Sequence, residues 1–172
     1  RPAAEHARLL LRAERGAACD GIRIRSGHGC VVACTTVDNA SGSGIFIDRG
    51  SRDTTVYDCT LVDNGGAAVR VGNASGTDID GNRIYRTRRP KATRTVRPDG
   101  ILLADEIRRR PSRHTTIRDN LIVNCETLLR LKTDRNRHCH ATSLDAGSSI
   151  HHNTFVAGPW TRCGIRIDDN PE

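Results

Sequence analysis

A short pattern recurs five times along this chain and constrains its fold more than any other feature. An apolar residue is followed three positions later by asparagine or cysteine, and two positions after that by an apolar residue or threonine. Asparagine is depleted in strands, and a buried amide without partners costs on the order of a few kcal/mol. The occurrences are Val31-Cys34-Thr36, Val56-Cys59-Leu61, Ile79-Asn82-Ile84, Ile117-Asn120-Ile122 and Ile150-Asn153-Phe155.

A second pattern alternates with the first: a short apolar pair, often opened by glycine. Its first apolar residues are separated by 23, 24, 32, 28 and 36 positions, so the chain repeats itself at a solenoid-like period. The members are Gly21-Ile22-Arg23-Ile24, Gly44-Ile45-Phe46-Ile47, Val69-Arg70-Val71, Gly100-Ile101-Leu102-Leu103, Leu129-Arg130-Leu131 and Gly164-Ile165-Arg166-Ile167.

Period and strand length together predict a β-solenoid. Each repeat carries two or three apolar stretches of about three to five residues, separated by Gly, Asn, Asp and Ser turns. Coils of this kind stack at strand spacing, roughly 4.8 Å. Asn82, Asn120 and Asn153 then lie in one column at an inward turn, where each amide can bond the turn backbone and the next amide.

In these repeats the chain resembles right-handed parallel β-helix proteins, the pectate-lyase-like superfamily with PbH1-type repeats, whose turn after the second sheet carries an asparagine ladder. The resemblance covers about residues 20–170. It implies an all-β, single-stranded, right-handed parallel β-helix of about six coils. We expect a piece of a longer helix, or one whose ends are capped by additional coils or by oligomerisation. The superfamily includes lyases, hydrolases, epimerases and non-catalytic proteins, so the resemblance is weak for function.

The whole chain, residues 1–172, is expected to form one domain with a basic insertion at residues 86–100. Residues 7–21 resemble the tail of an earlier coil. No segment is long enough to span a membrane. A long loop on a rigid scaffold is a common place for function, although a solvated charge run is an equal alternative.

Seven cysteines occur without any CxxC pair. The pattern aligns Cys34 with Cys59 in adjacent coils, at a separation near the disulfide range. We favour buried free thiols, because unpaired cysteine is among the most buried residue types. The amide column is then expected to start only at Asn82.

Net charge is +7, with a pI near 9.4, which favours an anionic partner. Alternate residues of a strand face opposite ways, so the residues between the inward apolar pairs must face outward. Across six coils the outward column is Arg23, Phe46, Arg70, Leu102, Arg130 and Arg166. The resemblance implies that this first sheet binds extended polysaccharides, so Arg23, Phe46, Arg70 and Arg166 are the candidate substrate-binding residues.

Catalysis is a further prediction. β-Elimination of a polyuronate needs a cation that neutralises the carboxylate and a base near the working pH. Lys132 is the candidate base, because Arg130 and Arg135 should depress its pKa, and Arg130 is the second candidate catalytic residue. Ordinary surface cations are the alternative for both.

Metal sites have weaker support. Calcium needs several clustered oxygens, and the acids near the ends of the first sheet lie on coils that are not all adjacent: Asp48, Asp105, Glu106, Asp168 and Asp169. We therefore keep Ca²⁺ only as a candidate cofactor. The histidine group (His138, His140, His151, His152, with Cys139) matches no strong metal motif and indicates surface histidines instead.

Two functions stay open at this stage. One is an extracellular or periplasmic carbohydrate-active domain that binds an acidic polysaccharide along the first sheet and cleaves it as a lyase. The other is a non-catalytic structural, adhesion or accessory solenoid. Nucleic-acid binding is disfavoured, because an aromatic content of 3% leaves no stacking platform.

Overall fold

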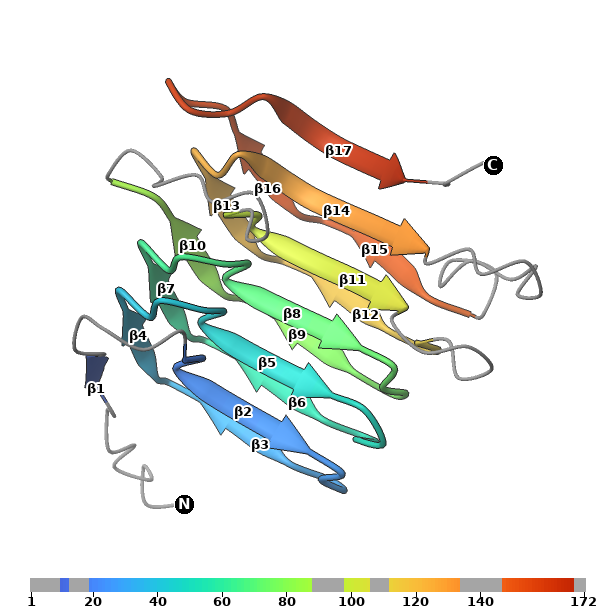
Figure 1. Cartoon of the computed structure of the whole chain (residues 1–172). Helices are drawn as coiled ribbons and strands as arrows, with labels where there is room; N and C mark the ends of the chain where they lie inside the picture. Colours follow the sequence, from blue (N-terminus) through green and yellow to red (C-terminus); the bar gives the residue numbers. More distant parts are fainter. Residues whose placement is uncertain (1–9, 13–18, 88–97, 106–111, 134–146, 169–172) are drawn as a thin grey trace, which may run out of the picture.

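The protein is a three-sided β-helix. The computed structural model describes residues 10–12, 19–87, 98–105, 112–133 and 147–168. All strand pairs among these residues are parallel, and they form three sheets that run side by side along one rod (Figure 1). The predicted all-β parallel β-helix is confirmed.

Each full coil contributes one strand to each sheet. The first sheet contains β2 (Ile22–Arg25), β5 (Ile45–Asp48), β8 (Val69–Gly72), β11 (Ile101–Asp105), β14 (Thr127–Thr133) and β17 (Cys163–Asp168). The second contains β3 (Val31–Ala33), β6 (Thr55–Tyr57), β9 (Asp78–Asp80), β12 (Thr116–Arg118) and β15 (Ser149–His151). The third contains β1 (Leu10–Arg12), β4 (Thr36–Asp38), β7 (Thr60–Val62), β10 (Arg83–Tyr85), β13 (Leu121–Val123) and β16 (Thr154–Val156).

Strand β1 precedes the first full coil. It pairs in parallel with β4, placing Leu10 beside Thr36 and Arg12 beside Asp38. The third sheet therefore extends one strand beyond β4.

The core consists of aliphatic columns, one residue from each coil. In the first sheet, pairing places Ile45 beside Val69, Val69 beside Ile101 and Ile101 beside Leu129, and all four side chains are fully buried. Stacked branched side chains fill most of the narrow interior, and Phe155 packs against the same core from β16. Gly100, the residue just before β11, has no room for a side chain, because a Cβ there would lie 2.3 Å from the carbonyl oxygen of Leu128.

Three asparagines stack at the corner between the second and third sheets. Asn120 Oδ1 accepts hydrogen bonds from the backbone N and from Nδ2 of Asn82, both at 2.9 Å. Asn153 Oδ1 accepts the equivalent pair from Asn120, at 3.1 and 2.9 Å. Amide nitrogens also donate to carbonyl oxygens of the preceding coil, such as Asn120 Nδ2 to Ile79 O at 2.9 Å. Each buried amide is thus satisfied by the corner backbone and by the next copy of itself.

The predicted alignment of Cys34 with Cys59 is wrong by one residue. Ala33 pairs with Tyr57, so Cys34 lies beside Asp58, and Thr35 lies beside Cys59. Cys34 adopts a left-handed φ of 50°, the conformation that Asp58 shares at 51°. Thr35 is buried and donates its hydroxyl to Ala33 O at 2.9 Å. The interior pattern of the first coil is therefore Val32-Thr35-Val37.

The cysteines in the described residues are free thiols. Cys59 and Cys125 are buried, as predicted for unpaired cysteine, and burial raises the pKa of Cys125 to about 12. Cys30, Cys34 and Cys163 are half-buried and Cys19 is exposed, so the prediction of burial fails for these four. Cys139 lies outside the described residues.

Replacing Asn120 with alanine should destabilise the fold by about 2–4 kcal/mol, because it leaves buried groups of Asn82 and of the corner backbone without partners. Urea unfolding measures the loss. Asn153→Ala is the matched control: Asn153 is only half-buried, so its loss should be smaller. Equal losses for the two variants would contradict a central role for Asn120.

Candidate functional site

The predicted outward column exists as one row on the outer face of the first sheet. Its six residues, paired strand by strand from β2 to β17, are Arg23, Phe46, Arg70, Leu102, Arg130 and Arg166. Neighbouring members are one strand spacing apart, roughly 4.8 Å. We call these residues the arginine row. The row runs along the rod, across the strands of the first sheet in Figure 1.

Phe46 lies between two arginines and is not open surface. The guanidinium carbon of Arg23 is 4.8 Å from the centre of its ring, and that of Arg70 is 4.5 Å away. Only 4% of Phe46 is exposed. Cation–π contact of this kind holds both guanidiniums over the ring. Burial lowers the pKa of Arg70. Phe46 therefore supports two cations. Its ring is not exposed, as stacking against a sugar would require.

Asp48 anchors the first arginine of the row. Arg23 Nη2 lies 2.5 Å from Asp48 Oδ2, and Arg23 Nε donates to the same oxygen at 3.2 Å. The backbone N of Arg49 donates to Asp48 Oδ1 at 2.7 Å. Burial alone would raise the pKa of Asp48, but these hydrogen bonds and the nearby charges lower it below its ordinary value.

At the other end of the row, two arginines hold one carboxylate. Arg130 donates from Nε to Asp168 Oδ2 at 2.5 Å, and its Nη2 is at the same distance from that oxygen. Arg166 Nε donates to Asp168 Oδ1 at 2.5 Å. Each oxygen of the Asp168 carboxylate therefore accepts a hydrogen bond from a guanidinium. Burial alone would raise the pKa of Asp168, but these hydrogen bonds lower it.

Arg130 also faces a second carboxylate that the sequence did not single out. Asp99, just before β11, is 1% exposed, and its Oδ2 lies 3.5 Å from Arg130 Nη1. Burial raises the pKa of Asp99 even beside this cation. The side chain of Arg130 is itself only 13% exposed. Asp99 belongs to the sequence stretch predicted as a basic insertion, so its acidic role had no signal in the charge pattern.

Lys132 lies two residues beyond Arg130 on β14, and its side chain is exposed. Pairing places it between Ala104 and Asp168. It faces the same side as Arg130, since alternate residues of a strand share a face. Arg135, the second cation expected to act on Lys132, lies outside the described residues.

The two candidate metal ligands whose side chains the structure describes, Asp48 and Asp168, lie far apart in the first sheet. Asp48 and Asp168 pair with arginines at opposite ends of the first sheet. The side chain of Asp105, with Glu106 and Asp169, lies outside the described part of the chain. Among the described residues, no group of three His, Cys, Asp or Glu side chains has a metal-binding arrangement.

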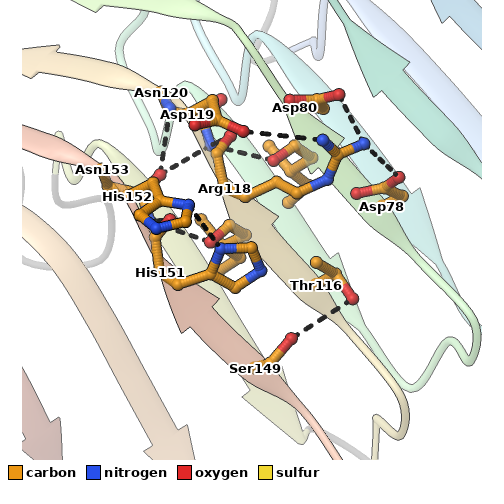
Figure 2. A network of polar contacts seen from close by, with 12 residues as sticks. Asp78, Asp80, Thr116, Arg118, Asp119, Asn120, Ser149, His151, His152 and Asn153 are labelled. Carbon is orange, nitrogen blue, oxygen red and sulfur yellow. Dashed lines mark hydrogen bonds and ion pairs between the residues drawn. The ribbon is translucent and has the colours of Figure 1, made fainter.

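Of the candidate histidine group, the structure describes His151 and His152. His151 and His152 are exposed neighbours whose rings meet edge to face, with centroids 4.9 Å apart (Figure 2). His138, Cys139 and His140 lie outside the described residues. The two described imidazoles thus form a local surface pair.

The second sheet carries an ionic network that the sequence reading missed. Arg118 lies 2.6 Å from Asp80, 3.4 Å from Asp78 and 3.5 Å from Asp119 (Figure 2). Burial raises the pKa of Asp80, with Asp78 and Asp119 acting in the same direction against Arg118. The alternating Asp78-Ile79-Asp80 triplet was the available signal. This face is acidic, opposite in sign to the arginine row.

None of the described residues forms a helix with the length and apolarity that crossing a membrane requires.

Asp48→Asn should lower stability at neutral pH by roughly 0.5–1 kcal/mol, a value discounted because Arg23 is half exposed. The native pKa of Asp48 lies below the unfolded value, so its contribution is present above the ordinary aspartate pKa of 3.8 and is lost as pH falls through the native pKa. The gap between wild type and variant should therefore close in acid. Urea unfolding across this range is the measurement. Asp53→Asn, at an exposed aspartate, should show little gap, and an equal gap at both sites would refute the assignment.

Comparison with known proteins supports the fold. No curated protein matches the sequence. A double mutant of the periplasmic alginate epimerase AlgG superposes with a TM-score of 0.61 and 15% identity, over 92% of this chain and 38% of that one. The A-module of the mannuronan C-5 epimerase AlgE4 from Azotobacter vinelandii gives a TM-score of 0.49 and 17% identity, over 88% of this chain and 46% of that one. This chain thus spans less than half the length of either structure. The family model for the right-handed β-helix region matches residues 15–171, and the chain belongs to that family.

Proposed function

We propose that the outer face of the first sheet binds an acidic polysaccharide, a polyuronate, along the arginine row. The observation that carries the proposal is the grip of Arg130 and Arg166 on a carboxylate. Guanidinium groups bind carboxylates through paired hydrogen bonds, and this chain already presents two of them to one carboxylate.

Asp168 occupies the position that a sugar carboxylate would take. Its two oxygens receive hydrogen bonds from separate guanidiniums, as a uronate carboxylate bound between two strands would. A uronate entering here exchanges one carboxylate for another, so the arginines keep a partner in both states. Arg166 is about half exposed, which leaves this end of the row open to solvent.

The row suits an extended ligand. Arg23 and Arg70 share Phe46 at one end, and Arg130 and Arg166 share Asp168 at the other. A linear polymer lying across the strands can reach both pairs, whereas a single sugar reaches one. The alginate epimerase that shares this fold is named for a polyuronate, which makes alginate a sensible first ligand to test. A ligand of this kind supports a location in the periplasm or the extracellular space.

A lyase step is the finer part of the proposal. Arg130 would neutralise the uronate carboxylate and so acidify the adjacent carbon-bound proton, and Lys132 would remove that proton. Both side chains leave the same face of β14, two residues apart. The glycosidic bond on the neighbouring carbon then breaks, and its electron pair leaves with the departing sugar oxygen, forming an unsaturated uronate.

A non-catalytic accessory role is the second candidate, favoured by the ion pairs themselves. Arg23, Arg130 and Arg166 are already ion-paired with carboxylates of the protein. Such pairs stabilise the surface and can bind an anion reversibly without any chemical step. Binding of polyuronate without turnover would identify this role.

Arg166→Gln should weaken binding of polymannuronate by about tenfold, because it removes one charged hydrogen-bond donor. Asp168→Asn should strengthen binding severalfold, since the sugar then no longer competes with the protein's own carboxylate. Calorimetric titration at two salt concentrations measures both. Arg113→Gln, at an exposed arginine outside the row, is the control. Weaker binding in Asp168→Asn, or equal loss in the control, would overturn the proposal.

Lys132→Ala should abolish any unsaturated uronate formed from alginate or pectate, detected by its ultraviolet absorbance, while leaving polymer affinity within about twofold. Lys132→Arg tests whether a cation alone suffices, because arginine keeps the charge but does not give up its proton. Undiminished product in Lys132→Ala would exclude Lys132 as the base. Absence of product in the wild type, with binding intact, would leave the accessory role.

A further inference from the structure

A polar cavity of about 580 Å³ lies at the corner between the second and third sheets. Three successive coils line it. Cys34, Asp58 and Gly81 come from the corner itself, and Thr36, Thr60 and Arg83 are the first residues of β4, β7 and β10. The volume is within the range of sites for small ligands, roughly 300–1,000 Å³. The first sheet does not form this corner, so the cavity is separate from the arginine row.

Gly81 opens the cavity. The corner row contains residues in the left-handed region: Cys34, Asp58, Gly81, Asp119 and His152, with φ between 50° and 61°. Gly81 is the member without a side chain. A Cβ there would lie 3.1 Å from Asp58 Oδ1, so any larger residue would occupy the space in front of that carboxylate.

The lining carries hydroxyl groups and charges of both signs. Thr36 pairs with Thr60 and Thr60 with Arg83, which places two hydroxyls and a guanidinium in line across three strands. Asp58, at the corner two residues before Thr60, adds a carboxylate to the same lining. Both Asp58 and Arg83 are exposed, and neither side chain forms a hydrogen bond or ion pair with another residue in the described ranges. Two opposite charges and two hydroxyls are thus available to one ligand.

We propose that this corner cavity binds a uronate unit of a short acidic saccharide. The sugar carboxylate would pair with Arg83, and ring hydroxyls would donate to Asp58 and exchange hydrogen bonds with Thr36 and Thr60. Free phosphate would be repelled by the Asp58 carboxylate, and a simple cation would be repelled by the Arg83 guanidinium. A ligand with hydroxyl donors and one anionic group satisfies both ends. The proposal shares its ligand class with the proposed function but rests on different residues.

The half-buried thiol of Cys34 provides a local reporter. We would measure alkylation of Cys34 by a maleimide with and without trigalacturonate, using tandem mass spectrometry to separate Cys34 from Cys30 in the same peptide. A bound saccharide should slow Cys34 modification by about fivefold or more near saturation. Exposed Cys19 is the internal control and should react at an unchanged rate. Neutral maltotriose should protect far less, because it lacks the carboxylate.

Variants assign the protection to the cavity. Arg83→Gln should abolish it, and Gly81→Asn, which keeps a residue tolerant of the left-handed region, should block entry. Arg166→Gln should leave Cys34 protection unchanged, even if it weakens polymer binding at the arginine row. Unprotected Cys34, equal slowing at Cys19, or protection that survives Arg83→Gln would overturn the corner site without bearing on the row. Loss of polymer binding in Arg166→Gln with intact Cys34 protection would leave both sites standing.

Discussion

Everything in this structure depends on coil-to-coil hydrogen bonding in register. Because each strand pairs in parallel with its equivalents in the neighbouring coils, a given position in one repeat touches the same position in the next. Inside the rod, this rule favours residues that pack against copies of themselves. Branched aliphatic residues do so by shape, and asparagine does so by donating to and accepting from another asparagine. The polar corner that looks costly in a single repeat becomes satisfied once three repeats stack.

Outside the rod, the same rule creates a cost. A repeated arginine brings like charges to about one strand spacing, roughly 4.8 Å, where repulsion is appreciable near a protein surface. Three features of the row reduce this repulsion between arginines. Phe46 separates Arg23 from Arg70, Leu102 separates Arg70 from Arg130, and the directly adjacent Arg130 and Arg166 share Asp168. The second sheet shows the inverse arrangement, one arginine among three aspartates. On both of these faces, side chains of like charge therefore have an opposite charge close by.

The interior columns and the arginine row could be predicted from the sequence. The alternation of inward and outward side chains along a strand, together with the repeat period, places residues in rows without knowledge of side-chain contacts. That is how the arginine row was predicted position by position. The first coil was misaligned because either Val31 or Val32 can face inward, and likewise either Thr35 or Thr36. The left-handed conformation of Cys34 decides which of them does. Asp99 could not be predicted as a partner of Arg130, since it lies in an irregular connection where period arguments fail. The burial of Phe46 depends on how two arginine side chains fold over it, which no pattern encodes.

Under the proposed function, these ion pairs decide what kind of ligand the row would prefer. A free guanidinium gains a new partner when an anion binds, but a paired one merely exchanges partners, so each contact contributes little net free energy. Affinity must then come from several exchanges made by one connected ligand, whose later contacts are intramolecular once the first has formed. The row places its arginines one or two strands apart along the rod, and a polymer of charged sugars is long enough to reach several of them. The spacing of the coils, more than the strength of any one arginine, is thus the property that would favour a long acidic polymer over a single acidic sugar.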